Sequence, residues 1–250
     1  MFDMHERLWY CNVEIGVDFL KQMHIPAEVV YVLAILLLSF SVAMAACTDF
    51  GISMIAAPAY ILSEKLPLTF GQCEYIVQGL LFIVFCILMK KVRLVYFSSF
   101  LTGIIYGAVL DLWRVLIPHF NPAVTAPGAL PFWLRIVYFI LSMVICAFSI
   151  ALFFHTYLYP QIYDFFVKGI SARYRLNRTR FKQGFDASCL LVSCVLTLVL
   201  FRRFVGIGVG TLVITLCNGF LIGKFSDLFD KHLKVEPLFP RFAEHFNLER

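Results

Sequence analysis

The stretch GIIYGAVLDLW at residues 103–113 is followed, 116 residues further along the chain, by GFLIGKFSDLF at residues 219–229. Both stretches carry two glycines four residues apart, then an aspartate four residues later and a leucine directly after it. Each stretch closes the third of three apolar segments. The repeated ending predicts a chain built from two related halves. Because each half holds an odd number of spans, the second half would cross a membrane upside down, an arrangement found mostly in transporters.

The composition is that of a membrane protein. Hydrophobic residues make up 61% of the 250 residues, charged residues 15%, and the mean hydropathy is +0.84. Soluble domains contain about 45–50% apolar and about 25% charged residues. The net charge of +5 does not indicate nucleic-acid binding, because the basic residues lie beside the apolar segments and form no separate patch. We interpret the eight cysteines as apolar packing residues, and not as disulfides or metal ligands.

Six apolar segments are predicted to be transmembrane helices. They cover residues 27–47, 72–89, 94–113, 134–158, 186–201 and 206–224. A further apolar stretch, 52–62, is too short to cross a membrane, and we expect a half-helix that is re-entrant or lies at the interface. The expected fold is all-α and polytopic, with six transmembrane helices in a single transmembrane domain that spans residues 1–250. Its inverted three-helix repeats are residues 25–113 and 132–229.

The remaining segments are expected to lie at the membrane surface. Residues 1–24 are predicted to form an amphipathic interfacial helix. Residues 230–250 are predicted to form a cytoplasmic tail that follows a second interfacial helix. The basic stretch 168–182 is interpreted as a loop that contacts anionic lipid head groups, with partner docking as the alternative. If both termini are cytoplasmic, cytoplasmic segments hold 16 of the 21 lysines and arginines, and this bias predicts that orientation.

Several short motifs resemble the YitT/YczE group of bacterial integral membrane proteins. They are DFGIS at residues 49–53 with Pro58, LTFG at 68–71, the Gly-x3-Gly-x3-Asp-Leu ending, and GVGT at 208–211. The resemblance implies a bacterial cytoplasmic (inner) membrane location and a duplicated helical fold, and it implies no settled activity. The sequence departs from the group at residues 153–155, where the second copy is expected to carry a glycine turn.

Polar side chains in or beside the apolar segments are the candidate site residues, because such groups are costly in a bilayer. Asp49, with Thr48 and Ser53, lies at a predicted helix break, where free backbone groups can bind ions or substrate. The alternative is a hydrated aspartate that caps the half-helix. Glu74 and Gln78 lie one turn apart and share a helix face. The alternative for Glu74 is that it only reaches water at the outer end of its span.

His155, close to Tyr157, has the chemistry of a proton relay, and the alternative is a hydrogen-bonded structural residue. Asn218 is expected to join two helices through its side chain. The four glycines of the repeated ending are interpreted as helix-packing positions, because small residues four apart let two helices approach closely. They are Gly103, Gly107, Gly219 and Gly223.

No enzyme motif occurs in the chain, and we expect no enzymatic activity, no cofactor, no metal site and no nucleic-acid partner. The first hypothesis is a small-solute or ion transporter whose central site is lined by the breaks near residues 49–58 and 155–160. The alternatives are a membrane scaffold or assembly factor, and a substrate-binding subunit of a larger transport complex. The substrate, and whether the partner is a second copy or another membrane protein, stay open.

Overall fold

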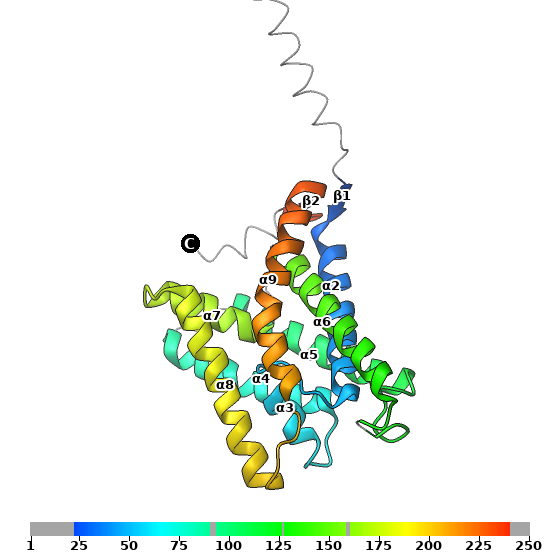
Figure 1. The fold of residues 1–250 in the computed structure, drawn as a ribbon. Helices are drawn as coiled ribbons and strands as arrows, with labels where there is room; N and C mark the ends of the chain where they lie inside the picture. Colours follow the sequence, from blue (N-terminus) through cyan, green and yellow to red (C-terminus); the bar gives the residue numbers. More distant parts are fainter. Residues whose placement is uncertain (1–22, 91–93, 127, 159–160, 241–250) are drawn as a thin grey trace, which may run out of the picture.

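The computed structural model describes residues 23–240, except 91–93, 127 and 159–160 (Figure 1). Its long helices are α2 (Ala27–Thr48), α4 (Phe70–Met89), α5 (Leu94–Leu116), α6 (Phe132–Phe154), α8 (Arg178–Phe201) and α9 (Val209–His232). The shorter elements are β1 (Met23–Pro26), α3 (Ala57–Ser63), α7 (Ile162–Arg173) and β2 (Leu233–Glu236). All six long helices are long and apolar enough to cross a membrane, α5 through its residues Tyr96–Leu116. The expected all-α polytopic membrane fold is therefore confirmed.

The two halves of the bundle repeat the same order of elements in opposite directions. A long helix, a short helix and two long helices occur as α2 to α5 and again as α6 to α9. Arg135 near the start of α6 donates from Nε to the carbonyl of Thr48 at the end of α2 (2.6 Å). Just after α6, the Tyr157 hydroxyl donates to Glu28 at the start of α2 (2.7 Å). These contacts at both ends show that α2 and α6 run antiparallel, as the inverted repeat requires.

The short helices α3 and α7 each pack against both halves of the bundle. Helix α3 packs on α4 of its own half and on α8 of the other, while α7 packs on α8 and on α4. The residues Ala57, Ala59 and Ile61 of α3 are fully buried, and the Tyr60 ring packs on Phe70 with 5.4 Å between centroids. The predicted half-helix is thus present, and it lies inside the bundle. Helices α4 and α8 cover its buried side chains, and a broken helix within a membrane protein needs such protein neighbours.

The prediction that the basic residues 168–182 form a loop is wrong. Residues up to Arg173 belong to α7, and α8 begins at Arg178, about two turns before the predicted start at 186. The Asn177 side chain caps α8 by accepting a hydrogen bond from the backbone N–H of Arg180 (3.1 Å). The basic side chains of the first turns conceal this start, because an apolar pattern begins only after them. The fourth span is also shorter than predicted and ends at Phe154.

The ends of the described bundle meet at one face. Helix α9 continues to His232, so the last span and the predicted second interfacial helix form one helix. Strand β2 follows and pairs in parallel with β1, with Met23 opposite Leu233. This small sheet adds to the predicted all-α fold. The interfacial helix predicted for residues 1–24 lies outside the described residues, apart from two residues of β1.

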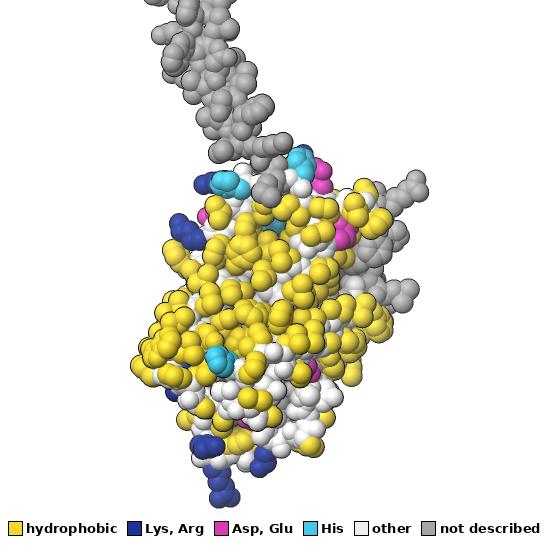
Figure 2. All heavy atoms as spheres, turned by 90° about the vertical axis from the view of Figure 1, so that its right-hand side faces the viewer, with side chains coloured by type: hydrophobic (Ala, Val, Ile, Leu, Met, Phe, Trp, Pro, Cys, Tyr) yellow, Lys and Arg dark blue, Asp and Glu magenta, His cyan; other side chains and the backbone are white. Residues whose placement is uncertain are grey.

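Apolar side chains cover the middle of the bundle surface. Figure 2 shows one face on which apolar side chains form a broad belt, with most charged side chains near its two ends. Helices α8 and α9 are the least buried of the candidate spans, and Leu216 of α9 is 80% exposed. A belt of this kind is the surface that a helix bundle presents to lipid. The seven cysteines of the described residues form no disulfide with one another, and Cys47 and Cys73 are buried.

Candidate functional site: a buried carboxylate between two unequal halves

A cluster of polar side chains lies buried where α4, α5 and α7 meet. On α4, Glu74 is 1% exposed and Gln78 is 0% exposed. Glu74 Oε2 accepts one hydrogen bond from Gln78 Nε2 (3.0 Å) and one from the Tyr163 hydroxyl (3.0 Å). Tyr106 of α5 and Gln161, just before α7, are buried next to them and are hydrogen-bonded through their side chains. We call these five residues the buried polar centre.

Each residue of the buried polar centre is placed by a local feature of the sequence. A capping box, in which Thr69 and Gln72 bond each other's backbone N–H, starts α4 one turn before Glu74. After α6 the chain turns back into the bundle, so the first turn of α7 brings Tyr163 against α4. On α5, Gly103 leaves room for the Gln78 amide, because a Cβ atom at this position would collide with it.

The buried polar centre has hydrogen-bonding capacity that the protein does not use. Glu74 Oε1, Gln78 Oε1 and Gln161 Nε2 are buried without a hydrogen-bond partner among the described residues. No basic side chain among the described residues forms an ion pair with Glu74. Each unsatisfied buried group costs about 1–3 kcal/mol, and a charged one more. Two acceptor oxygens beside two hydroxyls suit a proton or a small monovalent cation.

The repeated ending of the first half closes α5 onto α4 beside this centre. Asp111 accepts hydrogen bonds from the Thr69 hydroxyl (2.5 Å) and from the Gly71 N–H (2.8 Å) at the first turn of α4. A carboxylate at this position also faces the positive end of the helix dipole. A Cβ atom at Gly107 would meet the Gly71 carbonyl oxygen at 2.9 Å and the Tyr75 ring. Gly103 and Gly107 therefore do pack against a neighbouring helix.

The same ending in the second half makes none of these contacts. A Cβ atom on Gly219 or on Gly223 would meet nothing within 4 Å among the described residues. Within the same residues Asp227 takes part in no hydrogen bond and no ion pair, although its counterpart caps a helix. Figure 1 shows α8 and α9 diverging, whereas α4 and α5 pack closely. Among the described residues, these two glycines therefore make no contact that shows the predicted packing role.

Asp49, Thr48 and Ser53 lie at one end of α2, away from the buried polar centre. Asp49 has a φ of 56° and ends α2 in the left-handed conformation, so it does not cap the half-helix, whose N-cap is Ala56. Its carboxylate lies 3.8 Å from the Arg135 guanidinium and is 55% exposed. The Thr48 hydroxyl donates to the Ala45 carbonyl (2.8 Å).

His155 and Tyr157 lie at the opposite end of α2. His155 Nε2 is 2.9 Å from Asp230 of α9, and its Nδ1 bonds the carbonyl of Ala151. Burial and the hydrogen bond to Glu28 raise the pKa of Tyr157 to about 12. The 22 residues of α2 separate this cluster from Asp49 by about 33 Å. The two predicted breaks therefore do not line one central site.

Asn218 joins α9 to α6 through a weak hydrogen bond from Nδ2 to Cys146 Sγ (3.8 Å), and its Oδ1 is buried without a partner among the described residues.

Of the eight predicted site residues, only Glu74 and Gln78 belong to the buried polar centre. Sequence reasoning missed Tyr106, Tyr163 and Gln161. Tyr106 lies between the two glycines of the repeated ending, and this position is a signal that could have identified it.

The family of unknown function DUF6198 matches the chain over residues 25–227. The match covers most of the chain, which therefore belongs to this family. No curated protein and no solved structure matches the chain. The resemblance of the short motifs to the YitT/YczE group stays a prediction.

Proposed function

We propose that this member of DUF6198 is a cation-coupled transporter of small solutes in the bacterial cytoplasmic membrane, with both termini in the cytoplasm. The observation that carries the proposal is the unequal packing of two inverted halves around a buried carboxylate. Helices α4 and α5 are closed beside Glu74, while their counterparts α8 and α9 are apart. The proposal includes no chemical conversion of the solute.

The transport cycle exchanges the two packings. In the repeat alignment, Ala187 and Leu191 of α8 are the counterparts of Gly71 and Tyr75. When α9 closes onto α8, Gly223 therefore packs against these two residues. When α5 leaves α4, the Gln78 amide loses its place against Gly103, and Glu74 gains access from that side. Inverted repeats support such an exchange, because each half can adopt the packing of the other. With the termini in the cytoplasm, α4 and α5 close the outer side, and α8 and α9 are open toward the cytoplasm.

Glu74 is the proposed coupling site. A carboxylate held away from water is costly when charged, and binding a proton or a monovalent cation removes that cost. The hydrogen bonds from Gln78 and Tyr163 both reach Oε2, so Oε1 is left for the incoming ion. A proton is the first candidate, because it needs only the free Oε1 of Glu74, whereas both phenol hydroxyls of the centre already have hydrogen-bond partners.

The test measures charge movement in proteoliposomes adsorbed on a solid-supported membrane. A rapid pH jump is expected to give a transient current with the wild type and none with Glu74→Gln. Glu236→Gln removes an exposed acid from β2 and is the matched control, expected to behave as the wild type. A sodium jump at constant pH repeats the series for the other ion. Currents of wild-type size in Glu74→Gln would exclude it as the coupling site.

A wild type that gives no current in either series, while folded, would refute ion coupling and favour the scaffold hypothesis. The exposed apolar surfaces of α8 and α9 would then be the surfaces that bind a partner protein. Co-purification of such a partner in stoichiometric amount, independent of Glu74→Gln, would support that outcome.

A further inference from the structure

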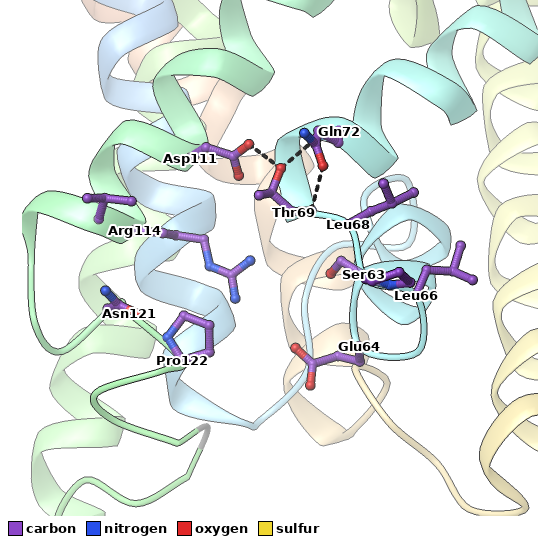
Figure 3. A pocket seen from close by; sticks show the side chains of 12 residues that line it. Ser63, Glu64, Leu66, Leu68, Thr69, Gln72, Asp111, Arg114, Asn121 and Pro122 are labelled. Carbon is purple, nitrogen blue, oxygen red and sulfur yellow. Dashed lines mark hydrogen bonds between the residues drawn. The ribbon is translucent and has the colours of Figure 1, made fainter.

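A pocket of about 410 Å³ (Figure 3) opens beside α3, at the end of the bundle that lies opposite β1 and β2 in Figure 1. Its walls are the turn after α3, the first turn of α4, the last turns of α5 and the start of the following loop. The volume lies in the range of small-molecule sites. Its apolar walls include Leu66, Leu68 and Val115, and its polar walls include Glu64, Asp111 and Arg114. This pocket contains none of the five residues of the buried polar centre.

Arg114 is the unusual member of this lining. It is only 9% exposed, and its Nε is buried without a hydrogen-bond partner in the part of the chain that the structure describes. Among the described residues, its guanidinium forms no hydrogen bond and no ion pair, and it lies over the Phe70 ring, 5.5 Å from the ring centroid. Figure 3 shows the guanidinium extending from α5 into the pocket. A buried guanidinium without a partner is a site for an oxyacid, which it can bind through two parallel hydrogen bonds.

The two carboxylates in the lining are not equivalent. Asp111 is engaged with the Thr69 hydroxyl and the Gly71 N–H, so it serves the start of α4. Glu64 is exposed at the rim and forms no ion pair among the described residues, and Figure 3 shows its carboxylate on the opposite side of the pocket from Arg114. A simple anion would be repelled by these carboxylates, and a simple cation would be repelled by Arg114. Only a molecule with both charges meets a partner at each wall.

We propose that this pocket binds a small zwitterion, with its carboxylate or phosphate on Arg114 and its ammonium group on Glu64. The apolar walls then hold the rest of the molecule, which fits an amino acid with an aliphatic side chain. The same chemistry is carried by the head group of phosphatidylethanolamine, so the source is a free zwitterion or that lipid. That the zwitterion is the transported solute rests on the proposed function, whereas the binding site itself does not.

Binding is measured by calorimetry on the detergent-purified full-length protein with three probes of one shape. Leucine carries both charges, 4-methylpentanoate lacks the ammonium group, and 3-methylbutylamine lacks the carboxylate. Leucine is expected to bind at least about tenfold more tightly than either analogue, because each charged hydrogen-bond partner contributes on that order. A second arm compares the melting temperature in phosphatidylcholine nanodiscs with and without phosphatidylethanolamine.

The variants are Arg114→Gln, Arg114→Lys and Glu64→Gln, with Arg203→Gln as a charge-matched control after α8, outside the pocket. Leucine affinity is expected to fall about tenfold to a hundredfold in Arg114→Gln and Glu64→Gln and to stay unchanged in Arg203→Gln. Arg114→Lys keeps the charge but not the two-bond geometry and is expected to bind at an intermediate level, which covers the case in which Arg114→Gln does not fold.

Stabilisation by phosphatidylethanolamine alone, lost in the same variants, would support the same chemistry with the lipid as its source. Equal binding of leucine and 4-methylpentanoate would overturn the proposal, as would the absence of binding in both arms. Glu74→Gln separates this inference from the transport proposal, because it leaves the pocket intact. Leucine binding that persists in a protein without ion currents would leave the pocket standing and remove its role in transport.

Discussion

The unequal halves can be tested by one alanine placed at two equivalent positions. In Gly107→Ala, the new Cβ would lie 2.9 Å from the Gly71 carbonyl oxygen and closer still to a carbon of the Tyr75 ring. The Gly71 carbonyl belongs to the backbone and cannot retreat without moving α4 away from α5, so we expect an overpacking cost of about 1–3 kcal/mol. Replacing a glycine within a helix by alanine also stabilises the folded state by about 0.5–1 kcal/mol. In Gly223→Ala the new Cβ meets nothing within 4 Å among the described residues, so only this helix stabilisation is expected.

The two variants should therefore differ by about 2 kcal/mol in the free energy of unfolding, with Gly107→Ala the less stable. Unfolding in mixed micelles of a mild detergent and dodecyl sulfate, followed by circular dichroism, measures this difference. Ion currents provide the second readout: Gly223→Ala should slow them, because the added methyl group hinders closure of α9 onto α8. Equal destabilisation by both alanines would show that α8 and α9 pack in membranes as α4 and α5 do, and would refute the reasoning.

Three further predictions follow from the same contacts. Asp111→Asn weakens the cap on α4 and should cost about 1–2 kcal/mol in that unfolding assay, whereas Asp227→Asn should cost nothing measurable. Tyr157→Phe removes a hydrogen-bond donor to the carboxylate at the start of α2 and should destabilise by about 1 kcal/mol, measured in the same way. In a chain without its native cysteines, the pair Leu191→Cys and Gly223→Cys should form a disulfide in membranes only while the transporter is cycling, as judged by gel mobility.

The fold followed from sequence where a pattern extended over a whole span. Twenty apolar residues leave few alternatives to a transmembrane helix, and the repeated ending gave the inversion. Helix α7 could not be found this way, because it has only 12 residues and its buried aromatic residues, such as Phe165 and Phe166, alternate with charged ones. Its helical state depends on packing against α4 and α8, which the local sequence does not encode.

The residues of the candidate site could be predicted from the sequence only in part. Glu74 and Gln78 could be identified because polar side chains in an apolar span need partners. Their partner Tyr163 could not, because its contact joins residues 89 positions apart through the turn back after α6. The breaks near residues 49–58 and 155–160 do not line one central site, for a reason inherent in inverted repeats. The symmetry carries a residue near one membrane face to the opposite face, so equivalent breaks meet only if both lie at the midplane.

The two aspartates of the repeated ending also explain why one side is closed. Asp111 finds free backbone N–H groups because α4 begins at Phe70, beside it. The counterpart of Gly71 is Ala187, nine residues into α8, where the backbone N–H is already used within the helix. Asp227 can therefore never cap α8, and the closed state of the second half lacks a contact worth about 0.5–2 kcal/mol.

This missing cap predicts which state the protein rests in. The packing of α4 on α5 is favoured over that of α8 on α9, so bound ion and solute must supply the difference before the halves exchange. Asp111→Asn reduces this advantage and should shift the population toward the state in which α4 and α5 are apart. A single cysteine at Gln78 would then react faster with a charged thiol reagent added from outside. An unchanged rate, in a folded variant, would mean that the cap does not set the balance.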